Sequence, residues 1–222
     1  MKIKISPSIL SANFACLGNE CRRVCSGGAD LVHVDVMDGC FVPNITIGAP
    51  VVRSIKPYSN IPLDVHLMID RPERYIDDFI DSGADIITVH FEATDKLDWI
   101  IDRIHAKGVK ASVSVKPNTN VDVLYPYLEK LDMVLIMTVE PGFGGQKLIE
   151  HTIPKISELR NKCVSLGLET DIEVDGGITP HNISRISKAG ANVFVAGSAV
   201  FKAESIADAI SQLRAGAESG RI

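Results

Sequence analysis

The chain has 222 residues, of which 45% are hydrophobic and 23% charged, and its formal net charge is -5 at pH 7. This length and composition allow one substantial buried core. The mildly acidic balance, without any run of lysine or arginine, argues against nucleic acid or an anionic membrane as a partner.

Neither export nor a membrane anchor is indicated by the sequence. The N-terminal segment M-K-I-K-I-S-P-S-I-L is too short, and too soon interrupted by Pro7, for a signal peptide. No apolar run approaches the roughly 18 residues of a membrane helix. Among five cysteines, Cys16, Cys21 and Cys25 are close together but lack CxxC spacing, which argues against a disulfide framework or a zinc knuckle. We therefore expect a cytoplasmic protein.

Short β-branched segments recur along the chain and predict eight strands. They lie at residues 3–10, 30–36, 62–69, 85–91, 110–115, 133–139, 171–174 and 192–196. Apolar residues recur at helical spacing between them, at Phe14, Leu17, Cys21 and Val24, at Tyr75, Ile76, Phe79 and Ile80, and at Ile153, Ile156, Leu159 and Cys163. Several of these stretches end at a glycine that can adopt the left-handed helix cap, at Gly28, Gly83, Gly108 and Gly190.

The alternation of eight strands with helices predicts an α/β fold. No G-x-G-x-x-G follows the first strand, and no linker interrupts the pattern, so a closed barrel is favoured over a doubly wound sheet. We expect a single-domain (β/α)8 TIM barrel over residues 1–222. In such barrels the chemistry lies where the strands end, which directs attention to polar residues near strand ends.

Imidazoles and carboxylates share one face of several predicted strands. His33 and Asp35 alternate on the second strand, Asp64 and His66 on the third, and Asp175 ends the seventh. A single inward histidine is more often a hydrogen-bonded core residue. Together, however, His33, Asp35, His66 and Asp175 suit a divalent transition metal, with Zn or Fe(II) first and Mn or Co as alternatives.

Two further groups of residues point to the same barrel mouth. Met37, Met68 and Met137 lie at or near strand ends, where they could fill the core or form an apolar cushion that excludes water. Both interpretations stay open. His90 should also point inward, but it has no evident carboxylate partner in the sequence, so we expect a core residue and leave it outside the site.

Three glycine-rich loops follow the last three strands, at 141–146, 175–178 and 196–201. Each alone could be a tight turn, but three in succession favour a phosphate site in which backbone N–H groups approach the anion closely. Only Lys147 and Lys202 lie at their edges, so binding should rely on backbone amides and Ser198. The candidate residues are Gly142, Phe143, Gly144, Gly145, Gly176, Gly177, Gly197 and Ser198.

Several long segments resemble one enzyme family over nearly the whole chain. They are S-P-S-I-L-S-A-N-F (6–14), H-V-D-V-M-D-G-C-F-V-P-N-I-T-I-G (33–48), D-V-H-L-M-I (64–69), M-T-V-E-P-G-F-G-G-Q (137–146), E-V-D-G-G-I (173–178) and A-G-S-A-V-F (196–201). All of them closely resemble ribulose-phosphate 3-epimerase. The resemblance implies interconversion of D-ribulose 5-phosphate and D-xylulose 5-phosphate in the pentose phosphate pathway with one divalent metal such as zinc.

The same resemblance implies roles for individual residues. It places His33, Asp35, His66 and Asp175 at the family's metal ligands and makes Asp35 and Asp175 its acid/base pair. Ser8, Met37, Met68 and Met137 match positions that line the substrate, which His33, His66 and Asp175 also adjoin. Inversion at C3 would proceed through an enediolate, with one acid/base group on each face. Cys40 departs from relatives that carry His or Arg there.

Other functions remain open at this stage. An allulose-6-phosphate 3-epimerase would share the barrel and metal site, and a non-catalytic sugar-phosphate-binding barrel would share the fold. A decarboxylase or aldehyde-lyase would want a strand-borne lysine near Asp35, and V-D-V-M-D offers none. We expect a small ketose phosphate as the partner, and a homo-oligomer, a dimer or larger, as the assembly.

Overall fold

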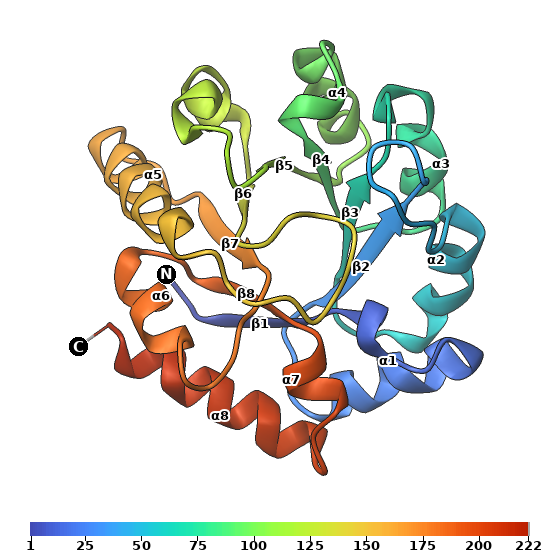
Figure 1. The fold of residues 1–222 in the computed structure, drawn as a ribbon. Helices are drawn as coiled ribbons and strands as arrows, with labels where there is room; N and C mark the ends of the chain where they lie inside the picture. Colours follow the sequence, from blue (N-terminus) through green and yellow to red (C-terminus); the bar gives the residue numbers. More distant parts are fainter. Residues whose placement is uncertain (222) are drawn as a thin grey trace.

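In the computed structural model, which describes residues 1–221, eight parallel strands form a ring with helices around it (Figure 1). The strands are β1 (Lys4–Pro7), β2 (Val32–Met37), β3 (Leu63–Met68), β4 (Ile86–His90), β5 (Lys110–Val115), β6 (Met133–Met137), β7 (Asp171–Asp175) and β8 (Val193–Ala196). This arrangement confirms the predicted (β/α)8 TIM barrel.

Between its first and second strands the ring is closed by an isolated bridge and a few hydrogen bonds, such as those from the Asp30 and Leu31 N–H groups to the Ile5 carbonyl. Neighbouring strands pair in the order β1-β8-β7-β6-β5-β4-β3-β2, and an isolated parallel bridge from Ser8 to His33 joins the two ends. β1 is shorter than the predicted strand at 3–10. The Ser8 side chain accepts a hydrogen bond from the backbone N–H of Leu10 and so starts a 3-10 turn in place of further strand.

Helices follow every strand except the fifth. They are α1 (Leu17–Ser26), α2 (Ala49–Ile55), α3 (Ile76–Asp81), α4 (Leu97–His105), α5 (Ile153–Ser165), α6 (Ile183–Ala189), α7 (Ser198–Phe201) and α8 (Ile206–Ser219). After β5 the chain forms a 3-10 segment, Val121–Lys130, with Pro126 inside it. Proline lacks the N–H that an α-helix would need there.

Short 3-10 segments also occupy Ile9–Ser11, Phe14–Cys16, Lys56–Tyr58, Pro72–Arg74, Phe91–Ala93 and Glu150–Thr152. Phe14 lies in one of them and Tyr75 just after another, so both fall outside the α-helices and are 45% exposed, against the predicted helical pattern. The predicted glycine caps are confirmed, with positive φ at Gly28, Gly83, Gly108 and Gly190.

The core has two parts, on either side of the strand wall. Valines such as Val32, Val34 and Val36 face the helices and belong to the main apolar cluster. Inside the barrel, the bottom layer is also apolar and consists of Leu31, Ile86, Met133 and Val193. The strand register places a polar layer above it, formed by Ser6, Asp64, Ser112 and Glu173, all buried.

This polar interior is unusual because bulky branched side chains normally fill such barrels. It lies directly beneath the residues predicted to carry the chemistry. Within residues 1–221, none of the helices combines the length and apolar character that crossing a bilayer would require. The five cysteines are all free, as the sequence predicts.

Candidate active site

Two histidines and two aspartates meet at the carboxyl ends of β2, β3 and β7. Asp35 lies opposite His66 in the register of β2 and β3, and Asp175 is the last residue of β7. His66 Nδ1 is 3.3 Å from Asp35 Oδ1 and 3.9 Å from Asp175 Oδ2. His33 Nε2 is 3.3 Å from Asp35 Oδ1 and 4.0 Å from Asp175 Oδ2. We call these four residues the His/Asp cluster.

The His/Asp cluster fits a metal ion. One ligand atom from each of the four side chains lies within 4.8 Å of all the others. His33 Nδ1 is 2.7 Å from Asp64 Oδ2, so Asp64 accepts the ring proton there. His33 Nε2 is buried and makes no hydrogen bond with any residue in 1–221; in the neutral ring with its proton on Nδ1, the Nε2 lone pair is directed toward Asp35 and Asp175.

The environment drives the pKa values of the two aspartates apart. Burial and the nearby Asp35 carboxylate raise the pKa of Asp175 to about 6, against the opposing pull of His33 and His66. Burial also acts to raise the pKa of Asp35, but attraction to the neighbouring His33 and His66 rings in their protonated form outweighs it and holds that pKa well below its ordinary value. Paired groups with separated pKa values suit acid and base roles.

Glu173 and Asp64 form a second, buried acidic pair beneath the His/Asp cluster. Glu173 Oε1 is 3.7 Å from His33 Nδ1, and both of its oxygens lack a hydrogen-bond partner among residues 1–221. Burial, together with the charge of Asp64, raises the pKa of Glu173 well above its ordinary range. Glu173 is absent from the predicted site, although it precedes Asp175 by two residues and so shares its face of β7.

The prediction that His90 lacks a carboxylate partner is wrong. His90 Nε2 is 2.9 Å from His66 Nε2, and His90 Nδ1 is 3.4 Å from Glu92 Oε2. Glu92 follows His90 by two residues, the same H-x-acid spacing as His33 and Asp35. That spacing is the sequence signal that could have brought His90 into the site.

A cavity of about 480 Å³ opens above the cluster. Asp35 and Asp175 line it, whereas His33 and His66 do not, because their rings are fully buried beneath the carboxylates. Ser8 also lines the cavity, and its hydroxyl donates a 2.5 Å hydrogen bond to Asp35 Oδ2. The three predicted methionines lie in the cavity wall and are almost fully buried: Met37, Met68 and Met137.

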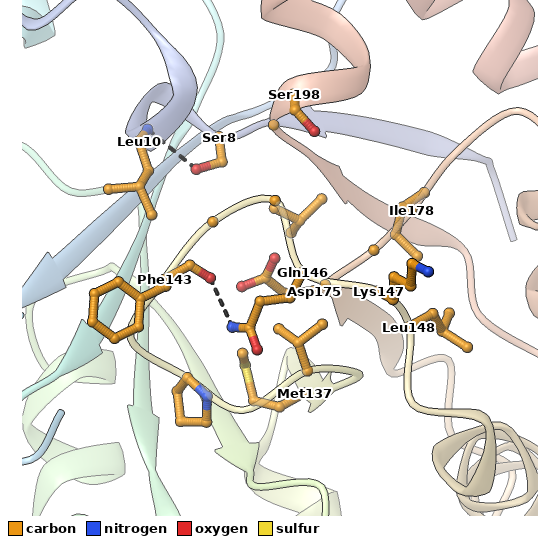
Figure 2. Close-up of a pocket in the computed structure, with 18 of the residues that line it drawn as sticks. Ser8, Leu10, Met137, Phe143, Gln146, Lys147, Leu148, Asp175, Ile178 and Ser198 are labelled. Atoms are coloured by element: carbon orange, nitrogen blue, oxygen red, sulfur yellow. Dashed lines mark hydrogen bonds between the residues drawn. The ribbon is translucent and has the colours of Figure 1, made fainter. Parts of the chain in front are cut away.

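The glycine loops line the same cavity, and Figure 2 shows Ser198, Ile178 and Phe143 on different sides of Asp175. All eight predicted loop residues belong to this lining. The backbone N–H groups of Gly177, Gly197 and Ser198 donate no hydrogen bond within residues 1–221. They are therefore free to bind an anion.

Some of these glycines are also required by packing. A Cβ on Gly177 would lie 2.3 Å from the backbone nitrogen of Leu148, and Gly177 has a φ of +67°. The loop after β6 is held closed on itself, since the Gln146 side chain donates to the carbonyls of Glu140 and Phe143 (Figure 2). Asn44, from the loop after β2, donates to the Gly142 carbonyl.

Several lining residues are absent from the predicted site. They are Leu10, Ser11, Val139, Pro141, Gln146, Leu148, Glu150, Ile178, Thr179, Asn182, Arg185 and Val195. Lys147 lines the cavity, whereas Lys202 does not. Arg185 is engaged by Glu150 through two hydrogen bonds of 2.5 and 2.7 Å. Among the cationic residues of this lining, Arg185 is thus paired with Glu150, whereas Lys147 makes no ion pair within residues 1–221.

The fold and the His/Asp cluster define a class of protein: a (β/α)8 barrel with a buried cluster that could hold a metal ion below a glycine-lined cavity. Residues 4–201 match the model of the ribulose-phosphate 3 epimerase family. The chain belongs to this family, which consists of enzymes.

Relatives with the same family name match this chain over nearly their whole length. The ribulose-phosphate 3-epimerase of Bacillus subtilis is 51% identical over 213 residues, covering 96% of this chain and 98% of the relative. That of Escherichia coli is 44% identical over 211 residues, covering 95% and 94%. The 3-hexulose-6-phosphate synthase of Salmonella typhimurium has the same fold, with a TM-score of 0.70 at 19% identity over 98% of this chain and 100% of that one.

Proposed function

We propose that this protein is a ribulose-phosphate 3-epimerase that interconverts D-ribulose 5-phosphate and D-xylulose 5-phosphate. The observation that carries the proposal is the meeting of Asp35 and Asp175 in a cavity that is also lined by free backbone amides. Membership of the family and the names of its well-covered relatives support the same substrate.

Asp35 and Asp175 are the proposed acid/base pair. Inversion at C3 needs one group to remove a proton from one face of the sugar and another to return a proton to the opposite face. The two carboxylates come from β2 and β7, on different sides of the ring, and both line the cavity. Ser8 holds Asp35 by a hydrogen bond, which fixes the direction of its carboxylate.

His33, Asp35, His66 and Asp175 are the proposed ligands of one divalent metal, with Zn or Fe(II) first and Mn or Co next. The mixed imidazole and carboxylate donor set suits these ions. Bound there, such an ion would polarise the C2 carbonyl and stabilise the negative charge that develops when C3 loses its proton.

The remaining residues would bind and enclose the substrate. The free amides of Gly177, Gly197 and Ser198 are the proposed phosphate donors, together with the loop at 142–145. Met37, Met68 and Met137 would cover the reacting carbon and exclude water, which strengthens the electrostatics beneath them. His33 and His66 would act on the substrate from below through the ion.

We also propose a role in the pentose phosphate pathway for a cytoplasmic homo-oligomer of single-domain subunits. One eight-stranded sheet in a single ring supports one domain over residues 1–222. Five free cysteines are typical of a reducing compartment.

The substrate proposal is tested by comparing kcat/KM for D-ribulose 5-phosphate with that for allulose 6-phosphate. The pentulose phosphate should be favoured by about 10-fold or more, because an extra carbon in a fitted pocket costs about 1–3 kcal/mol. Preference for the hexulose phosphate would overturn the substrate, and binding without turnover would indicate a non-catalytic barrel.

The metal proposal has its own test. Stripping the protein with a chelator should abolish turnover, and Zn, Fe(II) or Mn should restore it. Full activity in a preparation verified to be free of metal would contradict the proposal.

A further inference from the structure

Three hydrogen-bonded side chains, His66, His90 and Glu92, lead away from the His/Asp cluster on the side of β4. We call them the His66–Glu92 relay. His66 Nδ1 faces Asp35 and Asp175, while its Nε2 is 2.9 Å from His90 Nε2. The second nitrogen of His90 is 3.4 Å from the Glu92 carboxylate. Both imidazoles are fully buried, so their hydrogen-bonding groups depend on these neighbours.

The Glu92 carboxylate determines which ring nitrogen of His90 carries the proton. Its Oε1 accepts from the backbone N–H of Lys116 at 2.8 Å and from the Thr119 hydroxyl, while its Oε2 faces His90. A carboxylate with two donors on one oxygen is held in the ionised, accepting form. Facing it, His90 Nδ1 must carry the proton, which leaves His90 Nε2 with a lone pair.

The contact between the two histidines then has one polarity. Two ring nitrogens 2.9 Å apart need one proton between them, and His90 Nε2 has none to give. His66 must therefore donate through Nε2. In the neutral imidazole, this leaves Nδ1 of His66 unprotonated, and Nδ1 is the atom that faces the two aspartates.

Packing shields the His66–Glu92 relay from competing hydrogen-bond partners. The Phe41 ring lies 4.8 Å from the His90 ring, centroid to centroid, and Lys116 Nζ lies 4.0 Å from the Phe41 centroid. Phe41 thereby packs directly against the His90 ring. Within residues 1–221, His90 Nε2 is the only hydrogen-bond partner of His66 Nε2.

We propose that His90 and Glu92 are positioning residues that fix His66 in the tautomer with Nδ1 free for a metal ion. The inference rests on the proposed metal function of the His/Asp cluster. It gives His66 a counterpart to the direct bond from His33 to Asp64. Partners of this kind orient metal ligands, and their loss typically lowers metal affinity by about 10–100-fold.

The tautomer can be measured without metal or substrate. In wild-type protein with ¹⁵N-labelled histidine, NMR should place a proton on His66 Nε2 and on His90 Nδ1, with a scalar coupling between the two Nε2 atoms across their hydrogen bond. A proton on His90 Nε2 would overturn the inference. This measurement is independent of whether any variant folds.

Two substitutions of His90 separate hydrogen bonding from ring packing. His90→Phe keeps a ring of similar shape but cannot accept from His66, whereas the amide of His90→Gln can accept from His66 and donate to Glu92. Zn²⁺ affinity, measured by competition with a chromophoric chelator, should fall about 10–100-fold in His90→Phe. The His90→Gln value should lie closer to wild type.

His105→Phe is the matched control, because His105 bonds Asp132 on the outer surface and has no contact with the cluster. Its Zn²⁺ affinity should equal that of wild type. A folded His90→Phe protein with wild-type affinity would overturn the positioning role. Failure of wild-type protein to bind Zn²⁺, Co²⁺ or Mn²⁺ would overturn the proposed function instead. The tautomer measured in metal-free protein would still show whether His66 donates to His90 through Nε2.

Discussion

Two parts of the candidate site, the His/Asp cluster and the glycine loops, are built in opposite ways. The His/Asp cluster consists of ionisable side chains that strands hold at close range. The glycine loops present backbone amides and only a few polar side chains. The contrast fits the proposed roles: proton transfer would need specific ionisable groups despite their cost in stability, whereas an anion could be bound by backbone amides that glycine leaves accessible.

The largest expected effect is the loss of turnover in variants of the His/Asp cluster. Asp35→Asn and Asp175→Asn should each lower kcat by at least about 100-fold, because an amide cannot exchange a proton with C3. Steady-state assays with D-ribulose 5-phosphate measure this. Asp98→Asn, at a 66%-exposed side chain on α4, is the control and should keep wild-type turnover. Near-wild-type kcat in either cluster variant would remove that residue from the acid/base pair.

Substitutions in the glycine loops should first lower the free energy of unfolding. Gly177 and Gly145 share positive φ values of +67° and +75°, but only at Gly177 would a Cβ meet another backbone. Gly145→Ala should destabilise the protein by about 1–2 kcal/mol from conformation alone. Gly177→Ala should add about 1–3 kcal/mol from overpacking against Leu148. Urea unfolding measures both, and equal losses would show that the contact at Leu148 is unimportant.

Asp175 should reveal the stability cost of the cluster in metal-free protein. Its pKa rises from 3.8 to about 6 on folding, so the folded state binds the extra proton between these values. Its contribution to stability is therefore present at low pH and lost as pH rises through about 6. Asp175→Asn should stabilise metal-free protein by about 1–3 kcal/mol at pH 8 and by little below pH 4. A destabilised variant at pH 8 would contradict this.

The smallest expected effect is at Ser198. Its hydroxyl is one of several proposed donors to the phosphate, and a single such hydrogen bond contributes about 0.5–1.5 kcal/mol. Ser198→Ala should therefore raise KM by about 3–10-fold and leave kcat unchanged. A fall in kcat comparable to that of the cluster variants would place Ser198 in the chemistry, against the proposed division of the cavity.

Strand periodicity explains why much of the site could be predicted. Residues two apart on a strand share a face, and parallel strands end at one rim, so the sequence alone brings His33, Asp35, His66 and Asp175 together. The structure places all four within one cluster. The glycine loops could also be predicted from the sequence, because three of them follow consecutive predicted strands.

The features that sequence analysis missed depend on contacts between distant segments. The role of His90 requires knowing that its ring faces His66 and that Glu92 turns back toward it. Glu173 reads as an ordinary strand residue until barrel closure places it beside Asp64 and His33. The 3-10 segment after β5 departs from the predicted alternation of strands and α-helices, because Pro126 lacks the backbone N–H that an α-helix would use there.

The exchange of the C3 proton with solvent tests the central claim most directly. In D2O, wild-type enzyme should incorporate deuterium at C3 as it inverts that carbon, as observed by NMR of the pentulose phosphates. Asp35→Asn and Asp175→Asn should lose inversion, and each should retain exchange in at most one epimer, a different one for each variant. Inversion without deuterium incorporation, or inversion at the wild-type rate in either variant, would contradict two-carboxylate proton transfer.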